Sequence, residues 1–574
     1  MPRAITALLL QLLLLTCISA ALPPVVVDLR SQPLTTVLAV QVCAGLLNRD
    51  DARSPGAYTL MHDEDAGWLA ALVPGAAPAP TPAADFVAAC LAPPGGAAAG
   101  VLLINSTAQK AIIPNLITLA AVLGAVPLDA GSPLLPSPPP ATVFDAATAW
   151  AGFSPLAATE YMFARFAANT TTLAKMNPGW DVHGSPLAPP LTLEPDLSLT
   201  DYIVKARLFN FFLLEGCING TAEHALMERM AREGPWARPI AVLGYDDTLP
   251  IAGDVFEAET TCVSARDMGQ IASTGVNNLA FFSRSPRIAA PLAQAPTPAA
   301  AAIVYNASRT YLSIVIGDGD NLAFVKSSRR AWLEQRRAAC SGVSGGCFPL
   351  LWSLSPHLLE LAPDMLRWFF NVSLQTGADW FVLPPSGHLY AYPSLMPPAD
   401  QAAFVAATEA DCVLMNTSAS VAWEFVGSWG DAIASYFPRY APRGTVTALF
   451  AVNVPYMLPV VEFSPAEFFK VLNDSIVLFR PAEWRGTSGS ANPLLHPFLL
   501  SAAEMAALVN AYPAGTVAHF YVTSDGGADI QDVFDLVALL GEHVQVVDHV
   551  SLAQLALQSH QRAAAGAAAA GAVE

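Results

Sequence analysis

The sequence predicts an α/β protein in which an N-terminal α/β domain precedes a C-terminal (β/α)8-like barrel of the TIM type, regular or irregular. The chain has 574 residues. A chain of this length is too long for one ordinary hydrophobic core, so two or more domains are expected. Hydrophobic residues make up 53% and charged residues 13%, which favours large buried cores over disorder. Short apolar segments alternate with helical stretches in both halves, as in proteins with mostly parallel sheets.

The N-terminus has the pattern of a secretory signal peptide over residues 1–21. Arg3 supplies the positive charge, residues 7–15 are apolar, and residues 19–21 are small. No later apolar run is long enough to span a bilayer, so we expect no integral membrane segment. The sequence therefore predicts a secreted protein or one resident in the lumen of the secretory pathway.

A Pro/Ala-rich segment, residues 291–302, divides the rest of the chain and has the composition of a linker. We expect an N-terminal α/β domain over 22–290 and the barrel over 303–560. The Ala/Gly-rich end, 561–574, shows no packing face and is expected to be a disordered tail.

In the first half, residues 33–50 show the apolar spacing of an amphipathic helix. Short apolar runs bounded by turn residues predict strands. Those segments are 23–32, 98–105, 238–247 and 277–284.

The second half repeats a strand-then-helix rhythm over about 260 residues, the size of a (β/α)8 barrel. Continuous apolar strands fit parallel strands buried on both faces. The expected strand segments are 311–321, 349–356, 379–387, 411–416, 446–453, 475–484, 517–527 and 544–550. Seven strands or an irregular barrel would give the same pattern.

Polar residues follow these strands, and barrel enzymes build their active sites at the C-terminal ends of the strands. We therefore expect these side chains to meet at one mouth of the barrel. They are Asp318, Asp320, Asn321, Ser355, Ser386, His388, Asn453, Glu483, Trp484, Ser524 and Asp525.

One loop, "SGHLYAYP" at residues 386–393, resembles the signature of the GxGYxYP putative glycoside hydrolases through Gly387, Tyr390, Tyr392 and Pro393. Accompanying segments are similar as well. They are "DGDN" (318–321), "WSLSPHLLELAPDML" (352–366), "DWFVLPPSG" (379–387) and, in the first half, "VVDLRSQPLT", "GLLNRD" and "KARLFNFFLLEG". The second glycine of the signature is Leu389 here. The resemblance implies the N-terminal and C-terminal domains of that family and a carbohydrate-directed hydrolase barrel.

Glycoside hydrolysis uses two carboxyl groups that flank the scissile bond. On a strand, Asp318 and Asp320 would point to one side, and their proximity would raise the pKa of one of them. We expect one to act as acid or base, with Glu483 or Asp525 as the second carboxylate. Two alternatives stay open: a Ca²⁺ or Mg²⁺ clamp, and a strand-end turn in which these residues cap backbone amides.

Aromatic residues combine an apolar face with a polar edge, which suits sugar rings. The prolines around the signature loop restrict it, so that its tyrosines would be held in place. The expected substrate-binding residues are Asn321, Trp352, Ser386, Gly387, His388, Tyr390, Tyr392 and Trp484. Core or rim packing is the alternative for each aromatic residue.

The formal net charge of −19 argues against nucleic acid and anionic membrane surfaces as partners, whereas a neutral sugar meets no such repulsion. We expect no cofactor and no metal. The predicted function is cleavage of glycosidic bonds in an oligo- or polysaccharide by carboxylate acid/base catalysis. The alternatives are a non-catalytic carbohydrate-binding protein and a metal-dependent, deacetylase-type hydrolase, against which the few clustered histidines argue.

Two covalent features are expected in an oxidising compartment. Cys340 and Cys347 are close enough in sequence to form a disulfide. Seven N-x-S/T sequons predict N-linked glycans. They begin at Asn105, Asn169, Asn219, Asn306, Asn371, Asn416 and Asn473.

Overall fold

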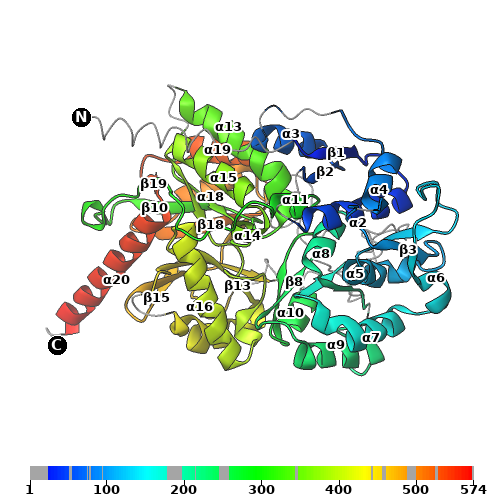
Figure 1. Cartoon of the computed structure of the whole chain (residues 1–574). Coiled ribbons are helices and arrows are strands. Elements are labelled where there is room, and N and C mark those ends of the chain that lie inside the picture. Colours follow the sequence, from blue (N-terminus) through cyan, green and yellow to red (C-terminus); the bar gives the residue numbers. More distant parts are fainter. Residues whose placement is uncertain are drawn as a thin grey trace, which may run out of the picture.

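A computed structural model describes most of the chain. The described residues are 23–50, 55–73, 75, 79–93, 95–176, 197–213, 215–244, 258–342, 347–440, 444–454, 460–487, 499–523 and 528–571. The predicted signal peptide lies outside them. Figure 1 shows the first half of the chain, in blue through cyan to green, beside the second half, in green through yellow to red.

Three small parallel sheets form the first half, each flanked by helices. In sheet order the strands are β1 (Val25–Asp28) and β2 (Ala57–Leu60); β4 (Ala125–Asp129), β3 (Gly100–Ile104) and β5 (Thr142–Asp145); β7 (Phe209–Phe211), β6 (Leu173–Lys175), β8 (Ile240–Leu243) and β9 (Met268–Ile271). The helices are α2 (Leu34–Asn48), α3 (Asp63–Leu72), α4 (Ala83–Leu91), α5 (Ile113–Leu123), α6 (Ala146–Ala149), α7 (Pro155–Phe166), α8 (Thr200–Ala206), α9 (Ala222–Glu233), α10 (Ala258–Ser264) and α11 (Leu279–Phe282).

The described residues of the second half form two sheets, one of six strands and one of four. One has the order β12 (Asp379–Val382), β11 (Leu350–Ser353), β10 (Thr310–Ile316), β18 (Val517–Val522) and β17 (Glu483–Trp484), with β19 (Val544–Val546) also paired to β10. The other has the order β13 (Ala419–Phe425), β14 (Ala448–Val454), β16 (Ile476–Phe479) and β15 (Phe469–Leu472). All pairings are parallel except that of β15 with β16.

The helices of the second half alternate with these strands. They are α12 (Leu322–Phe324), the π-helix η4 (Val325–Arg329), α13 (Arg330–Ser341), α14 (Leu358–Leu361), α15 (Pro363–Thr376), α16 (Pro398–Met415), α17 (Trp429–Asp431), α18 (Ala502–Asn510), α19 (Ile530–Ala538) and α20 (His549–Gly571).

The predicted α/β class with mostly parallel sheets is confirmed, but no closed eight-stranded barrel is found among the described residues. Within the described part of the second half, one backbone bridge, between Leu383 and Ser420, joins the two sheets. Their inner faces nevertheless share one buried cluster, to which β10, β13, β14, β16 and β18 all contribute. Phe450 of β14 stacks on Phe479 of β16 and lies 5.2 Å from the His519 ring of β18. The two sheets therefore enclose a common core without a continuous ladder around it.

Three predictions about segments are wrong. Residues 411–415 belong to α16, and Asn416 is its C-cap. The buried Phe404, Thr408, Asp411, Cys412 and Met415 follow helical spacing, and a short apolar run alone cannot distinguish a buried helix from a strand. Within 277–284, Leu279–Phe282 form α11 and no residue lies in a strand. The expected disordered tail is helical to Gly571, since alanine favours helix without a packing face. Figure 1 shows the last turns of α20 projecting from the body.

The expected disulfide between Cys340 and Cys347 is confirmed, and a second bond, which the sequence analysis did not predict, joins Cys217 to Cys262. The expected linker packs against the second half, where Gln294 Nε2 donates to the carbonyls of Phe381 and Met415. Within the described parts of the chain, none of the helices has the length and hydrophobicity needed to cross a membrane.

Candidate active site

The two aspartates of "DGDN" lie in a turn after β10, not on the strand. The strand ends at Ile316, and Asp318 has a left-handed backbone with φ of 56°. Asn321 caps the next helix, because its side chain accepts a hydrogen bond from the Ala323 N–H at 3.0 Å. The expectation that period-two alternation sets the direction of Asp318 and Asp320 is therefore wrong, and Asn321 has the capping role that was the alternative.

Neighbouring strands hold this turn at the C-terminal edge of the sheet. The Tyr521 hydroxyl on β18 accepts a hydrogen bond from the Asp318 N–H at 2.6 Å, and Ser353 Oγ on β11 accepts one from the Gly319 N–H at 2.9 Å. A Cβ on Gly319 would lie 1.7 Å from the Ser353 carbonyl oxygen, so only glycine fits there. The turn is thus fixed by both strands that flank β10.

A buried arginine stands beside the same turn. Arg329, from η4, donates to the Gly317 carbonyl through Nε at 3.1 Å and Nη2 at 2.7 Å. Its Nη2 lies 3.6 Å from Asp318 Oδ2. The guanidinium thus contacts both the backbone of the turn and the Asp318 side chain.

Glu483 is the second carboxyl group at this mouth. It pairs in register with Tyr521, so its side chain points to the same face as the Tyr521 ring, which is part of the inner cluster. Burial raises the pKa of Glu483 to about 7; Arg485 and Thr523 act to lower it, and the charge of Asp318 raises it further. Arg485 Nε lies 3.0 Å from Glu483 Oε1, and Thr523 donates a hydrogen bond to the same oxygen.

Of the predicted catalytic residues, the structure thus brings Asp318, Asp320 and Glu483 to one edge of the sheet. The charges of both aspartates act on the Tyr521 hydroxyl, which places Asp320 close to Asp318. Asp525 and Ser524 lie outside the described residues. Tyr521 and Arg329 were missed; the pairing of β10 with β18 brings Tyr521 to this edge, and η4 brings Arg329. The sequence had placed Arg485 near Glu483 as the partner of a surface ion pair; the pair is present but buried.

Two tryptophans expected at the substrate face are turned away from it. Trp352 is buried on the outer side of β11, and its Nε1 donates to Asp379 Oδ1 at 2.8 Å. Trp484 is fully buried, and its Nε1 donates to the Leu500 carbonyl at 2.7 Å. Strand alternation puts both on the opposite face from Leu351 and Glu483, so the expectation of stacking platforms is wrong for both.

The signature loop joins the two halves of the molecule. Tyr390 pairs with Gln270 of β9 through two backbone hydrogen bonds of 2.9 Å, and the Tyr392 N–H donates to Ser264 Oγ at 2.9 Å. The Tyr392 side chain is fully buried, and Tyr390 is 8% exposed with its ring 5.5 Å from Trp423. The expectation that Tyr392 presents its hydroxyl to an open cleft is therefore wrong, because the loop packs between the halves.

The other expected contacts in this loop also have internal partners. Ser386 Oγ donates to the carbonyls of Ala391 and Trp423 at 2.7 and 2.8 Å. His388 Nδ1 lies 2.7 Å from Asp411 Oδ2 on α16. These contacts fix the loop on the second half, and they do not place Ser386 or His388 beside Asp318.

Gly387 is required by both its backbone and its surroundings. Its φ is 102°, and a Cβ would lie 2.6 Å from Thr408 Cγ2. We expect Gly387→Ala to lower the free energy of unfolding by about 2–3 kcal/mol. Gly377→Ala is the matched control, since Gly377 has φ of 65° but nothing within 4 Å of its Cβ position, and should cost about 1 kcal/mol. Chemical denaturation of both variants measures the difference; equal losses would contradict the close packing of the loop.

Glu424 is a further buried carboxyl group, on the outer side of β13. Its oxygens accept hydrogen bonds from the Ser394 N–H and hydroxyl and from the Ser428 hydroxyl. Burial raises its pKa to about 8, although these hydrogen bonds act in the opposite direction. It faces the same way as Ala422, away from the inner cluster.

Over the described residues, no group of three His, Cys, Asp or Glu side chains has the geometry of a metal site.

Comparison with known proteins gives a matching domain for part of the second half and a shared fold. Residues 308–453 match the GxGYxYP putative glycoside hydrolase C-terminal domain, which confirms the resemblance of this segment. A crystal structure of a putative hydrolase from Bacteroides thetaiotaomicron VPI-5482 superposes with a TM-score of 0.70 at 16% identity, covering 93% of this chain and 94% of that one. This similarity establishes a shared fold.

A 4-alpha-glucanotransferase from Thermococcus litoralis reaches a TM-score of 0.27 at 15% identity, covering 42% of this chain and 37% of that one, and carries no argument. None of the curated proteins compared with the chain matches it.

Proposed function

Because residues 308–453 match the GxGYxYP putative glycoside hydrolase C-terminal domain, we propose that this protein hydrolyses glycosidic bonds of an oligo- or polysaccharide. One observation carries the proposal: a buried carboxyl group with a raised pKa, Glu483, and a carboxylate beside a guanidinium, Asp318, share one mouth. Two carboxyl groups in contrasting environments are what this chemistry needs.

In this mechanism Glu483 is the general acid. It donates its proton to the oxygen of the leaving sugar as the bond to the anomeric carbon breaks. Asp318 is the second carboxylate and acts either as nucleophile at the anomeric carbon or as base toward a water molecule. Asp320 contacts substrate hydroxyls, and Tyr521 and Arg329 hold Asp318 in place.

The two sheets of the second half, which enclose a common core without closing into a barrel, would serve as the scaffold. Their C-terminal edge would carry the active site, as it does in barrel enzymes. The predicted signal peptide and sequons are consistent with a secreted glycoprotein, which is part of the proposal. A non-catalytic carbohydrate-binding protein is the alternative, but it would not need two carboxyl groups, Glu483 and Asp318, at one edge of the sheet.

The test is release of reducing sugar from a panel of neutral polysaccharides. On the substrate that is found, we expect kcat/KM to fall as the pH rises through about 7, approaching about tenfold per pH unit, because the raised pKa keeps Glu483 protonated only below this value. Activity that stays level to pH 9, or that Asp318→Asn leaves intact, would refute the assignment. No hydrolysis of any panel member, with sugar binding retained, would favour the binding protein.

A further inference from the structure

A cavity lies at the other end of the strands, far from Asp318. It has a volume of about 540 Å³, within the range of small-molecule sites. Its lining comes from Trp380 near the start of β12, Ser418 just before β13, Thr445 before β14 and His549 at the start of α20. Since the strands are parallel and β10 and β13 each span seven residues, this end is about 20 Å from the mouth.

The cavity is polar but holds no fixed charge. None of its lining residues is Asp, Glu, Lys or Arg, and the hydroxyl-bearing side chains of Thr297, Ser418 and Thr445 surround the space. Trp380 contributes apolar ring surface, while its Nε1 is already bonded to the Ala295 carbonyl at 2.8 Å. An uncharged ligand rich in hydroxyl groups fits this lining better than an ion does.

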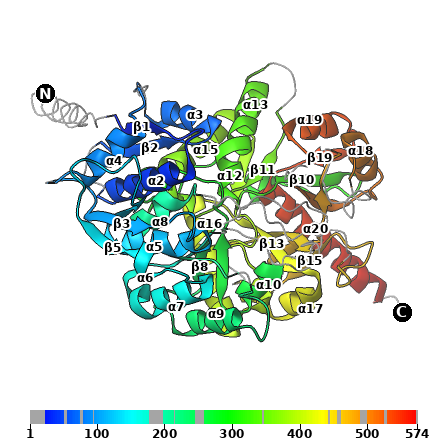
Figure 2. The ribbon, with the colours of Figure 1, turned by 90° about the vertical axis from the view of Figure 1, so that its right-hand side faces the viewer.

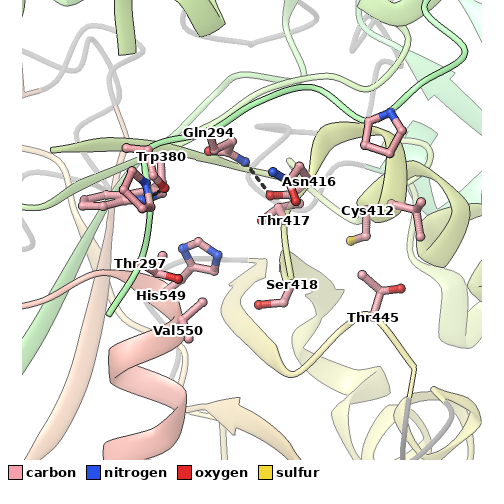
Figure 3. A pocket seen from close by; sticks show the side chains of 14 residues that line it. Gln294, Thr297, Trp380, Cys412, Asn416, Thr417, Ser418, Thr445, His549 and Val550 are labelled. Atoms are coloured by element: carbon pink, nitrogen blue, oxygen red, sulfur yellow. Dashed lines mark hydrogen bonds between the residues drawn. The ribbon is translucent and has the colours of Figure 1, made fainter. Parts of the chain in front are cut away.

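His549 supplies the observation that points to a ligand. It is 3% exposed, and its Nδ1 is a buried nitrogen without a hydrogen-bond partner. Figure 3 shows the imidazole at the cavity, near Thr297 and Ser418. Burial lowers the pKa of His549 to about 4, against the effect of Asp548, so the ring is neutral at physiological pH. Buried polar atoms in proteins rarely lack a partner, and a ligand hydroxyl would provide one.

We propose that this cavity is a binding site for one neutral sugar residue, which His549, Ser418 and Thr445 hold through its hydroxyl groups. The inference does not depend on hydrolysis at the mouth. Two sources could supply the same chemistry. One is a free saccharide, and the other is the first sugar of a glycan on Asn416, which is exposed at the rim and begins the sequon Asn416-Thr417-Ser418.

The first arm of the test uses protein made without N-glycosylation. Binding of glucose, maltose and N-acetylglucosamine is measured by titration calorimetry on the unmodified chain, on His549→Phe and on Thr445→Leu. His549→Phe keeps the ring volume but removes Nδ1, and Thr445→Leu fills the cavity from the opposite side, so one variant serves if the other fails to fold. We expect each variant to weaken binding at least tenfold and Glu483→Gln to leave it unchanged.

The second arm uses the glycosylated protein, and both cavity variants keep the sequon. If the glycan on Asn416 is the source, an endoglycosidase should release it at least tenfold more slowly from the native protein than from either variant, and no free sugar should bind. Binding that Glu483→Gln abolishes would place the sugar at the mouth and overturn the proposal. So would the absence of both free-sugar binding and glycan protection.

Discussion

Glu483→Gln should lower kcat by about 100- to 10,000-fold on a natural polysaccharide substrate, the range that a general acid contributes. The amide has the shape of the acid and can still accept the hydrogen bond from Thr523, but its NH2 group is not acidic enough to transfer a proton to the leaving sugar. The decline in activity above pH 7 should disappear in the variant, because the group that titrates there is gone. Steady-state kinetics between pH 4 and 9 measures both effects.

Glu424→Gln is the matched control. Both carboxyl groups are buried and have raised pKa values, of about 7 for Glu483 and about 8 for Glu424, yet only Glu483 is turned toward the inner cluster that ends beside Asp318. Glu424→Gln should therefore keep kcat within about threefold of the unmodified enzyme. Aryl glycosides with an acidic leaving phenol need little protonation, so Glu483→Gln should be least impaired on them. Equal losses in the two variants would contradict the role of Glu483.

Sequence reasoning grouped the candidate residues through their strand ends. The "DGDN" turn and Glu483 each follow or end an apolar run, and parallel strands bring such ends to one edge. The face of the sheet to which each side chain points could not be predicted. Side chains alternate between the two faces along a strand, so assigning a residue to one face requires knowing where the strand begins. Trp352 and Trp484 were assigned to the wrong face for this reason.

Long-range pairing explains the other omissions. Tyr521 and Asp318 are 203 residues apart in sequence, and nothing local to either one predicts that the hydroxyl accepts the hydrogen bond of the turn. The tyrosines of the signature loop were predicted to bind substrate because aromatic rings with a hydroxyl group suit sugars. Its bridge to Gln270 and its contact with Ser264 depend on where the first half lies, which local sequence does not reveal.

The contact between the halves also runs through the first helix after the active-site turn. Figure 2 shows α12 in the middle of the molecule, and the Leu322 N–H donates to the Ala272 carbonyl of the first half at 2.8 Å. Within η4, Lys326 reaches into the first half, where its Nζ lies 2.5 Å from Asp65 Oδ1. Three residues on, Arg329 reaches back to Gly317 and Asp318. One π-helix thus connects the interface to the candidate active site.

Lys326→Met should lower the free energy of unfolding by about 3–5 kcal/mol, the usual cost of removing one partner of a buried ion pair. The exposed fraction is 1% for the Lys326 side chain and 0% for that of Asp65, so no water can replace the lost cation. The Asp65 carboxylate would keep its hydrogen bonds from the Met61 and His62 N–H groups and from Asn277, but not its countercharge. Thermal and chemical unfolding measure the loss.

Two controls separate this effect from a general loss of lysine. Lys470→Met removes a partly exposed pair with Glu467 and should cost no more than about 1 kcal/mol. Asp65→Asn combined with Lys326→Met removes both charges and should recover part of the stability that Lys326→Met alone loses. Because η4 also carries Arg329, Lys326→Met should reduce kcat even at temperatures where the protein stays folded. A stability loss no larger than that of Lys470→Met would show that the interface does not depend on this pair.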